Sequence, residues 1–85
     1  RYIDGTPLLA VEVLSGSDTA EGVYEKTQIY LEAKTPVVWV VDPFNRIVIV
    51  HRPNSAPVFF NESQELTSEP ELPGFRCPVS ELFRI

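Results

Sequence analysis

The amino-acid sequence predicts an α/β fold: a βαβ unit extended by an antiparallel hairpin into a mixed sheet with one main helix. Residues 7–15 and 37–42 are two nearly continuous apolar runs, a pattern typical of strands in a parallel sheet. Residues 19–34 between them follow a helical period, and the β-branched segment 47–52 follows the second run. Two such strands joined by a helix run parallel, and the next segment returns beside the second strand.

The boundaries of the helix have their own signals. Asp18 and Glu21 predict a capping box at its start. Pro36 predicts its end, because the residue before a proline avoids the α region. The predicted inner face has helical spacing and consists of Val23, Thr27, Tyr30 and Ala33.

The rest of the chain reads as shorter elements. We expect the first strand over residues 9–14, a turn over 42–46, a short strand over 58–60, a brief edge strand over 64–67 and a last helical turn over 79–83. In that last turn Leu82 and Phe83 should pack against the core.

Four other side chains have ordinary structural interpretations. Trp39 alternates with valines and is expected in the core or at an interface. Asp42 precedes Pro43 and suits an Asx turn. His51 lies in an outward-facing β pattern and is expected at the surface, and Cys77 is expected to be a small packed hydrophobe.

Composition narrows the function classes. The 85 residues fit a single domain, residues 1–85, and no apolar run approaches a membrane span. The single Cys77 excludes an internal disulfide, so we expect a cytoplasmic protein. A net charge of −5 argues against a constitutive basic face that binds nucleic acid, although in an acidic nuclease a bound cation supplies positive charge locally.

Residues 1–3 look like the tail of a strand without an initiating Met, so we expect an N-terminally truncated domain.

Glu12 is the first candidate for chemistry, because a carboxylate inside an apolar strand is costly without a partner. Glu12 could give one oxygen ligand to Mg²⁺, and the carbonyl of Val13 another. Lys26, on the border of the inner helix face, could orient a water or stabilise charge on a phosphate. In the alternative interpretation, Glu12 only pairs with Lys26 or with a backbone amide.

Several separated motifs resemble the Uma-two family of restriction-endonuclease-like proteins, which belong to the PD-(D/E)XK nuclease superfamily. The resemblance extends over nearly the whole chain, and the motifs occur in the same order and spacing. They are residues 7–18 (PLLAVEVLSGSD), Glu25-Lys26 with Tyr30, residues 38–43 (VWVVDP), residues 72–75 (LPGF) and residues 81–83 (ELF).

The resemblance implies a restriction-endonuclease-like core and a Mg²⁺-dependent phosphodiester hydrolase that acts on DNA. It implies that Glu12 is the metal-binding acid and that Lys26 replaces the lysine that many nucleases carry at the position of Leu14. The family's first aspartate falls on Leu8, which cannot bind a metal. Asp4 lies before the turn and is not expected to substitute for that acid. Gly16 in place of the family's proline is a milder departure.

Three functions therefore stay open. The first is a Mg²⁺-dependent DNA endonuclease that uses Glu12 and Lys26. The second is a catalytically inactive nuclease-fold scaffold or homo-oligomeric interaction domain, favoured by Leu8, in which exposed strand edges pair into a dimer. The third is a small interaction module unrelated to nucleic acid, favoured by the charge of −5.

Overall fold

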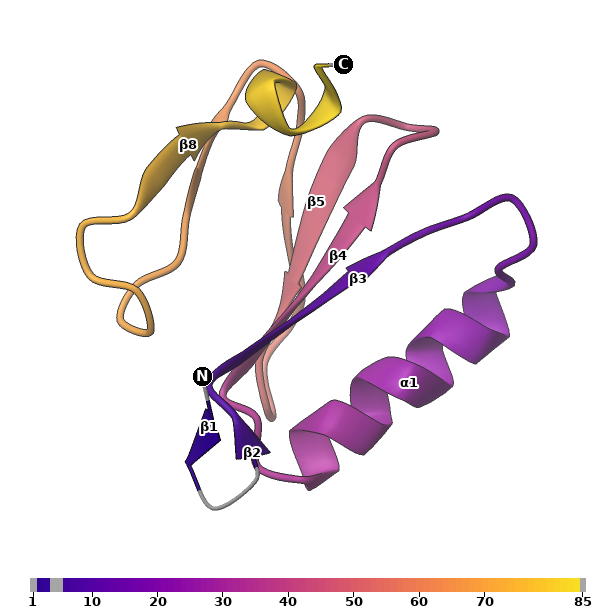
Figure 1. The fold of residues 1–85 in the computed structure, drawn as a ribbon, viewed down its shortest axis with the longest axis vertical. Coiled ribbons are helices and arrows are strands. Elements are labelled where there is room, and N and C mark those ends of the chain that lie inside the picture. The colour runs from indigo at the N-terminus through magenta and orange to yellow at the C-terminus, as the bar shows by residue number, and fades with distance from the viewer. Residues whose placement is uncertain (1, 4–5, 85) are drawn as a thin grey trace.

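The computed structural model describes residues 2–3 and 6–84 (Figure 1). Asp4 therefore lies outside the described residues. The elements in chain order are β1 (Tyr2–Ile3), β2 (Thr6–Pro7), β3 (Leu9–Val13), α1 (Ala20–Glu32), β4 (Val37–Asp42), β5 (Ile47–His51), β6 (Val58–Phe60), β7 (Glu65–Thr67), β8 (Arg76–Pro78) and a short 3-10 helix, η1 (Val79–Phe83).

The central sheet has the strand order β3-β4-β5-β6. β3 runs parallel to β4, with Leu9 beside Val37, whereas β5 and β6 each run antiparallel to the preceding strand. β1 with β2 and β7 with β8 form two separate antiparallel pairs. The predicted fold class, a βαβ unit extended by an antiparallel hairpin, is confirmed.

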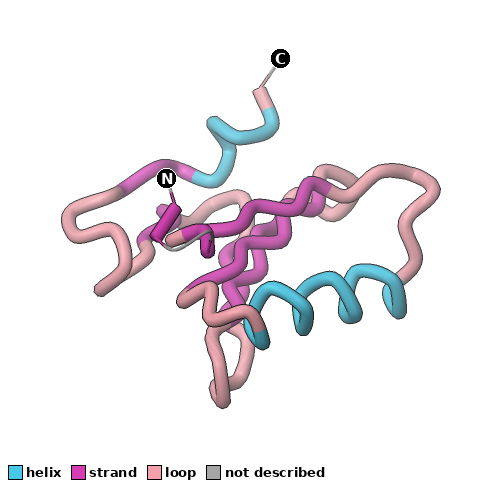
Figure 2. The backbone as a smooth tube through the Cα atoms, turned by 60° about the horizontal axis from the view of Figure 1, so that its bottom comes forward, coloured by secondary structure: helices cyan, strands magenta, loops and turns pink. Residues whose placement is uncertain are grey.

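Both faces of the central sheet are covered, which produces three layers (Figure 2). α1 lies along one face, and β8 with η1 lies on the other. Every residue of β4 is buried, as the continuous apolar run predicts for a central strand. The core between the sheet and the C-terminal segment consists of Val37, Trp39, Val41, Val48, Val50, Leu66 and Val79.

Trp39 anchors the C-terminal segment to the sheet, as its predicted core position requires. It is 7% exposed, and its ring centroid lies 5.4 Å from that of Phe75. Its indole Nε1–H donates to the Ser68 hydroxyl over 3.3 Å. The Trp39 side chain therefore buries apolar surface against the C-terminal segment and has a hydrogen-bond partner for its indole N–H.

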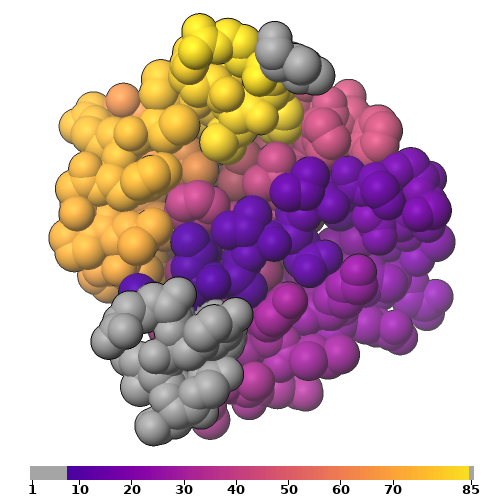
Figure 3. Space-filling view, in the orientation of Figure 1, coloured from indigo at the N-terminus to yellow at the C-terminus, as the bar shows by residue number. Residues whose placement is uncertain are grey.

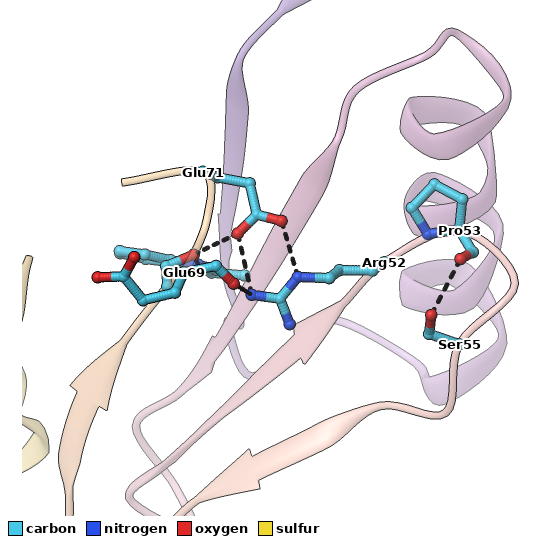
Figure 4. Close-up of polar contacts among 7 residues, drawn as sticks. Arg52, Pro53, Ser55, Glu69 and Glu71 are labelled. Atoms are coloured by element: carbon cyan, nitrogen blue, oxygen red, sulfur yellow. Dashed lines mark hydrogen bonds and ion pairs between the residues drawn. The ribbon is translucent and has the colours of Figure 1, made fainter. Parts of the chain in front are cut away.

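A second link joins β5 to the segment after β7 (Figure 4). The Arg52 guanidinium donates from Nε and Nη2 to the two carboxylate oxygens of Glu71, over 2.8 and 2.9 Å, and Nη2 also donates to the Glu69 carbonyl. Glu71 accepts a further hydrogen bond from Ser68. This bidentate pair, whose side chains are 26% and 9% exposed, continues the polar network that begins at Trp39.

The predicted capping box at the start of α1 is wrong. The N-cap is Thr19, whose Oγ1 accepts from the Gly22 N–H over 3.0 Å. Asp18 instead accepts hydrogen bonds from the backbone N–H and the hydroxyl of Ser15, which closes the preceding turn. A Cβ at Gly22 would lie 3.1 Å from Thr19 Oγ1, so the glycine leaves room for the cap.

The other end of α1 also differs. The helix ends at Glu32, before the predicted residue 34, and Lys34 takes a left-handed conformation with φ of 74°. Of the predicted inner face, Thr27 is buried, Val23 and Tyr30 are half-buried, and Ala33 is exposed.

Near the C-terminus the brief strand near residue 64 is present as β7, and the sequence did not predict its partner β8. Phe83 packs against the core, but Leu82 is 40% exposed, so the prediction that both pack down is wrong for Leu82. Cys77 is half-buried and lies opposite Leu66.

Thr35 is fully buried, and its hydroxyl has no hydrogen-bond partner among the described residues. Burying an unpaired hydroxyl costs free energy. We expect Thr35→Val to raise the free energy of unfolding by about 1 kcal/mol, measured by urea denaturation. Thr27→Val is the matched control, because the buried Thr27 hydroxyl donates to the Val23 carbonyl over 2.9 Å and should give no gain. A Thr35→Val protein less stable than the parent would contradict this expectation.

Candidate functional site

Glu12 and Lys26 meet where α1 crosses the edge strand β3. In the parallel register Glu12 lies beside Val40, and its side chain is on the face of the sheet that α1 covers. Lys26 Nζ lies 3.6 Å from Glu12 Oε1. The Glu12 side chain is 20% exposed and that of Lys26 is 55% exposed. The pair is thus accessible from solvent. The two residues lie close together because α1 packs over β3 in the βαβ unit.

Other acids do not gather around this pair. Among residues 2–3 and 6–84, no three His, Cys, Asp or Glu side chains are placed to hold a metal ion together. Leu8, where the sequence resemblance implies an aspartate, is a half-buried apolar side chain without an oxygen ligand. Of the predicted oxygen ligands, this leaves Glu12 and the Val13 carbonyl, and Mg²⁺ in proteins is usually bound by one or two carboxylates together with several waters.

The two aspartates near the C-terminal ends of β3 and β4 have local structural roles. Asp42 is buried and accepts hydrogen bonds from the backbone N–H groups of Phe44 and Asn45 and from the Asn45 side chain, as the predicted Asx turn requires. Burial raises the pKa of Asp42, but these hydrogen bonds outweigh burial and lower the pKa overall. The Ser15 hydrogen bonds lower the pKa of Asp18. Both carboxylates are already occupied within their own turns.

A cavity of about 430 Å³ lies between α1 and the sheet, and Glu12 and Lys26 do not line it. Its walls are mostly apolar and include Val23, Val40 and Ile49, with His51 among the polar groups. His51 is half-buried and lines this cavity, so the expected surface position is only partly correct. Burial lowers the pKa of His51. The pattern of β5 alone did not indicate that His51 lines a cavity together with residues of α1.

Two comparisons with known proteins gave a match. A family model, Uma2, described as "Putative restriction endonuclease", matches residues 1–80. A solved structure from Anabaena variabilis, described as "a putative nuclease belonging to DUF820", has a TM-score of 0.81 and 22% sequence identity to this chain. That match covers 92% of this chain and 44% of the other chain, so this chain spans less than half of that protein's length. The search of curated proteins found no match.

The four-stranded mixed sheet with one helix and the structural match define an α/β protein with a nuclease-like fold. Because the family model covers most of the chain, this chain belongs to the Uma2 family. The resemblance found from the sequence motifs is confirmed. None of the helices in the described part of the chain is long and apolar enough to cross a membrane.

Proposed function

We propose that this chain carries catalytic residues of a Mg²⁺-dependent DNA endonuclease that hydrolyses phosphodiester bonds. The observation that supports the proposal is the Glu12–Lys26 pair on β3 and α1 of a Uma2 family member, 3.6 Å apart and open to solvent. A carboxylate beside a lysine at the edge of a sheet offers one group for a cation and one for a phosphate oxygen.

The roles follow from the chemistry of each group. Glu12 and the Val13 carbonyl would hold the cation, which when bound supplies Lewis acidity toward a phosphate oxygen and lowers the pKa of a bound water. The Lys26 ammonium is a mobile point charge with three donors. It neutralises Glu12 in the absence of substrate and can turn to a phosphate oxygen, because more than half of its side chain is exposed. Lys26 would then stabilise negative charge that develops on the phosphate.

The second candidate function is an inactive scaffold with the same fold. Leu8 supports it, because the position that the family fills with an aspartate has no oxygen in this chain. With one carboxylate instead of two, affinity for a hard cation should be low. The two candidates differ in one measurable property, which is cleavage of DNA.

The test is cleavage of supercoiled plasmid DNA with Mg²⁺ and with EDTA. We expect Glu12→Ala to reduce metal-dependent cleavage at least about 10²-fold, because the group that holds the cation is lost. Leu8→Asp should raise cleavage by restoring a second carboxylate. Glu32→Ala, which removes an exposed carboxylate at the end of α1, is the control and should leave the rate unchanged.

Unchanged cleavage by Glu12→Ala would refute the assignment of Glu12. If the parent does not cleave DNA but Leu8→Asp does, the nuclease site is otherwise intact and lacks one metal ligand. If neither the parent nor any variant cleaves DNA, the result would favour the inactive scaffold.

A further inference from the structure

The cavity between α1 and the sheet has no role in the proposed function. Val40 of β4 and Ile49 of β5, which lie side by side in the antiparallel register, form its floor, and Val23 of α1 lines it from the helix side. The remaining walls come from the loops that follow β3 and β4, so the described residues themselves build the cavity. Figure 3 shows the loop before α1 and α1 itself, in purple, along the right-hand side of the molecule. The volume of about 430 Å³ falls within the range of about 300–1,000 Å³ that is typical of small-molecule sites.

The end of the cavity near the C-terminus of β5 has two polar side chains without a protein partner. Among the described residues, neither the His51 imidazole nor the Tyr24 hydroxyl makes a hydrogen bond, and both side chains line the cavity. The Thr27 hydroxyl, in contrast, donates to a carbonyl of its own helix. Because burial lowers the pKa of His51, its ring is neutral at pH 7 and offers one N–H donor and one nitrogen acceptor. This end of the cavity can therefore form hydrogen bonds with a ligand.

The opposite end of the cavity offers hydrogen-bond acceptors. β3 and β4 run parallel, so the loops that follow them lie at the same edge of the sheet, and Asp18 and Asn45 of these loops line the cavity there. The Asn45 side-chain nitrogen donates to Asp42, and the Asn45 side-chain oxygen has no partner among the described residues. The turn before α1 uses only Oδ2 of Asp18, which leaves Oδ1 free within the described chain. A ligand that reaches this end must therefore bring N–H donors, and the two carboxylates disfavour an anionic group.

Two aromatic side chains lie at the rim of the cavity. Phe44, next to Asn45, and Tyr24 both line the cavity, and each is 64% exposed. Exposed aromatic rings are stacking surfaces for nucleic-acid bases, because every base has a flat π face. A planar ring that enters the cavity can therefore keep one face against an aromatic side chain.

The two polar ends of the cavity are too far apart for one planar ring. Ile47 lies beside Asp42 at the end of β4, and His51 is four residues further along β5. At about 3.4 Å per residue, the Cα atoms of Ile47 and His51 are about 13–14 Å apart. A base joined to its sugar is long enough to reach the polar groups at both ends, whereas a base alone is not.

We propose that this cavity holds one nucleoside unit whose base carries an exocyclic amino group. The base would lie against Phe44, with its amino group directed at Asn45 and Asp18. Adenine, cytosine and guanine each present such a donor, whereas thymine does not. The sugar would lie at the other end, within hydrogen-bond reach of Tyr24 and His51. A second cavity, of about 540 Å³, is also lined by Tyr24 and His51 and lies away from the two carboxylates, which leaves room for the attached phosphate.

Two sources supply this chemistry. One is a free nucleotide, and the other is a nucleotide that has left the base stack of a DNA strand. The second source rests on the proposed function, whereas the cavity and the first source do not. The cavity lies close to the candidate site in the fold, because Val40 lines it and lies beside Glu12 in the parallel register. A nucleotide of a DNA strand held here would therefore be near the Glu12–Lys26 pair.

The first test is isothermal titration of the chain with deoxyadenosine monophosphate (dAMP) in the presence of EDTA. The matched ligand is the same nucleotide without its exocyclic amino group. We expect dAMP to bind at least about 10-fold more tightly, because the analogue brings no N–H donor to Asn45 and Asp18. Absence of dAMP binding, or equal affinities for dAMP and the analogue, would overturn the proposal.

The second test changes the protein. Phe44→Ala should weaken dAMP binding about 10-fold, because the substitution removes the stacking surface. The Phe44 side chain is exposed, so the fold should persist, which circular dichroism checks. The matched control is Phe59→Ala, which removes a 58% exposed ring on β6 that does not line the cavity and should leave the affinity unchanged. Parent-like binding by Phe44→Ala, or an equal loss of affinity in Phe59→Ala, would refute the site.

The third measurement distinguishes the two sources and separates this proposal from the proposed function. The chain is titrated with dAMP and with a single-stranded oligodeoxyadenylate, again with EDTA. Tighter binding of the oligonucleotide, weakened by Phe44→Ala by the same factor as dAMP binding, would assign the cavity to a DNA strand, whereas binding of dAMP alone would assign it to a free nucleotide. Phe44-dependent binding by a chain that does not cleave DNA would refute the proposed function alone. Cleavage of DNA by a chain that binds neither ligand would refute the nucleoside site alone.

Discussion

Trp39→Ala is expected to cause the largest loss of stability of any single substitution considered for this chain. An 85-residue domain has a free energy of unfolding of about 4–13 kcal/mol. Removing a buried tryptophan costs about 3–5 kcal/mol, through lost burial and the cavity that remains. Trp39 also packs against Phe75 in a tilted arrangement and donates to Ser68, so its removal should weaken the contact between the sheet and the segment that contains β7, β8 and η1.

Circular dichroism during urea denaturation measures this effect, because the chain has no other tryptophan to report by fluorescence. Trp39→Phe keeps an aromatic ring but loses the Nε1–H donor, so it should cost only about 1–2 kcal/mol. Tyr24→Ala removes an aromatic side chain that is 64% exposed and should change stability by less than about 0.5 kcal/mol. A Trp39→Ala protein within about 1 kcal/mol of the parent would show that the C-terminal segment is held by other contacts.

The elements that sequence patterns predicted well are those whose burial is complete. β4 was predicted at its exact bounds, because an apolar run of this length between a helix and a turn needs cover on both faces. The run of β3 is equally apolar, but its burial in the described chain differs. Val11 is 48% exposed and Val13 is 62% exposed. An apolar run indicates a strand but does not reveal how many neighbours it has.

Two smaller errors concern the start of α1 and the strand β8. Asp18 and Thr19 can both cap a helix, and the choice of Thr19 depends on Ser15, which occupies the Asp18 carboxylate. β8 escaped prediction because a three-residue strand that ends in proline has no periodic signal and exists only through its pairing with β7.

The candidate site illustrates the same limit. The βαβ pattern brought Glu12 and Lys26 to one face of the unit, and the structure has them paired. The ion pair alone does not distinguish a catalytic role of Glu12 from a purely structural one. An ion pair at the edge of a sheet has the same geometry in both cases. The half-buried position of His51 depends on how far α1 extends over β5, which a local pattern cannot give.

Glu71→Gln is expected to have the second largest effect, by breaking the link between β5 and the segment after β7. The substitution preserves shape but removes the charge that accepts two hydrogen bonds from Arg52. Because the Glu71 side chain is only 9% exposed and that of Arg52 is 26% exposed, solvent compensates the loss poorly. We expect the free energy of unfolding at pH 7 to fall by about 2 kcal/mol, measured by urea denaturation.

The matched control is Glu65→Gln. Glu65 also accepts two hydrogen bonds from one arginine, Arg76, but their side chains are 41% and 70% exposed. Exposed ion pairs contribute little, so this substitution should change stability by less than about 0.5 kcal/mol. Similar losses for the two variants would indicate that burial is not what makes the Arg52 link strong.

The pH dependence gives the Glu71 prediction a signature that packing alone would not give. The hydrogen bonds from Arg52 lower the pKa of Glu71 below its usual value near 4.5, although burial opposes this shift. A carboxyl with a lower pKa in the folded state stabilises the fold above its unfolded pKa, and this contribution is lost as the pH falls through the folded pKa. The stability difference between the parent and Glu71→Gln should therefore be constant above about pH 5.5 and shrink on acidification below about pH 4.5. A difference that stays constant down to the acid transition would mean that the ionised carboxylate of Glu71 is not the source of the stabilisation, because its contribution is lost when it takes up a proton.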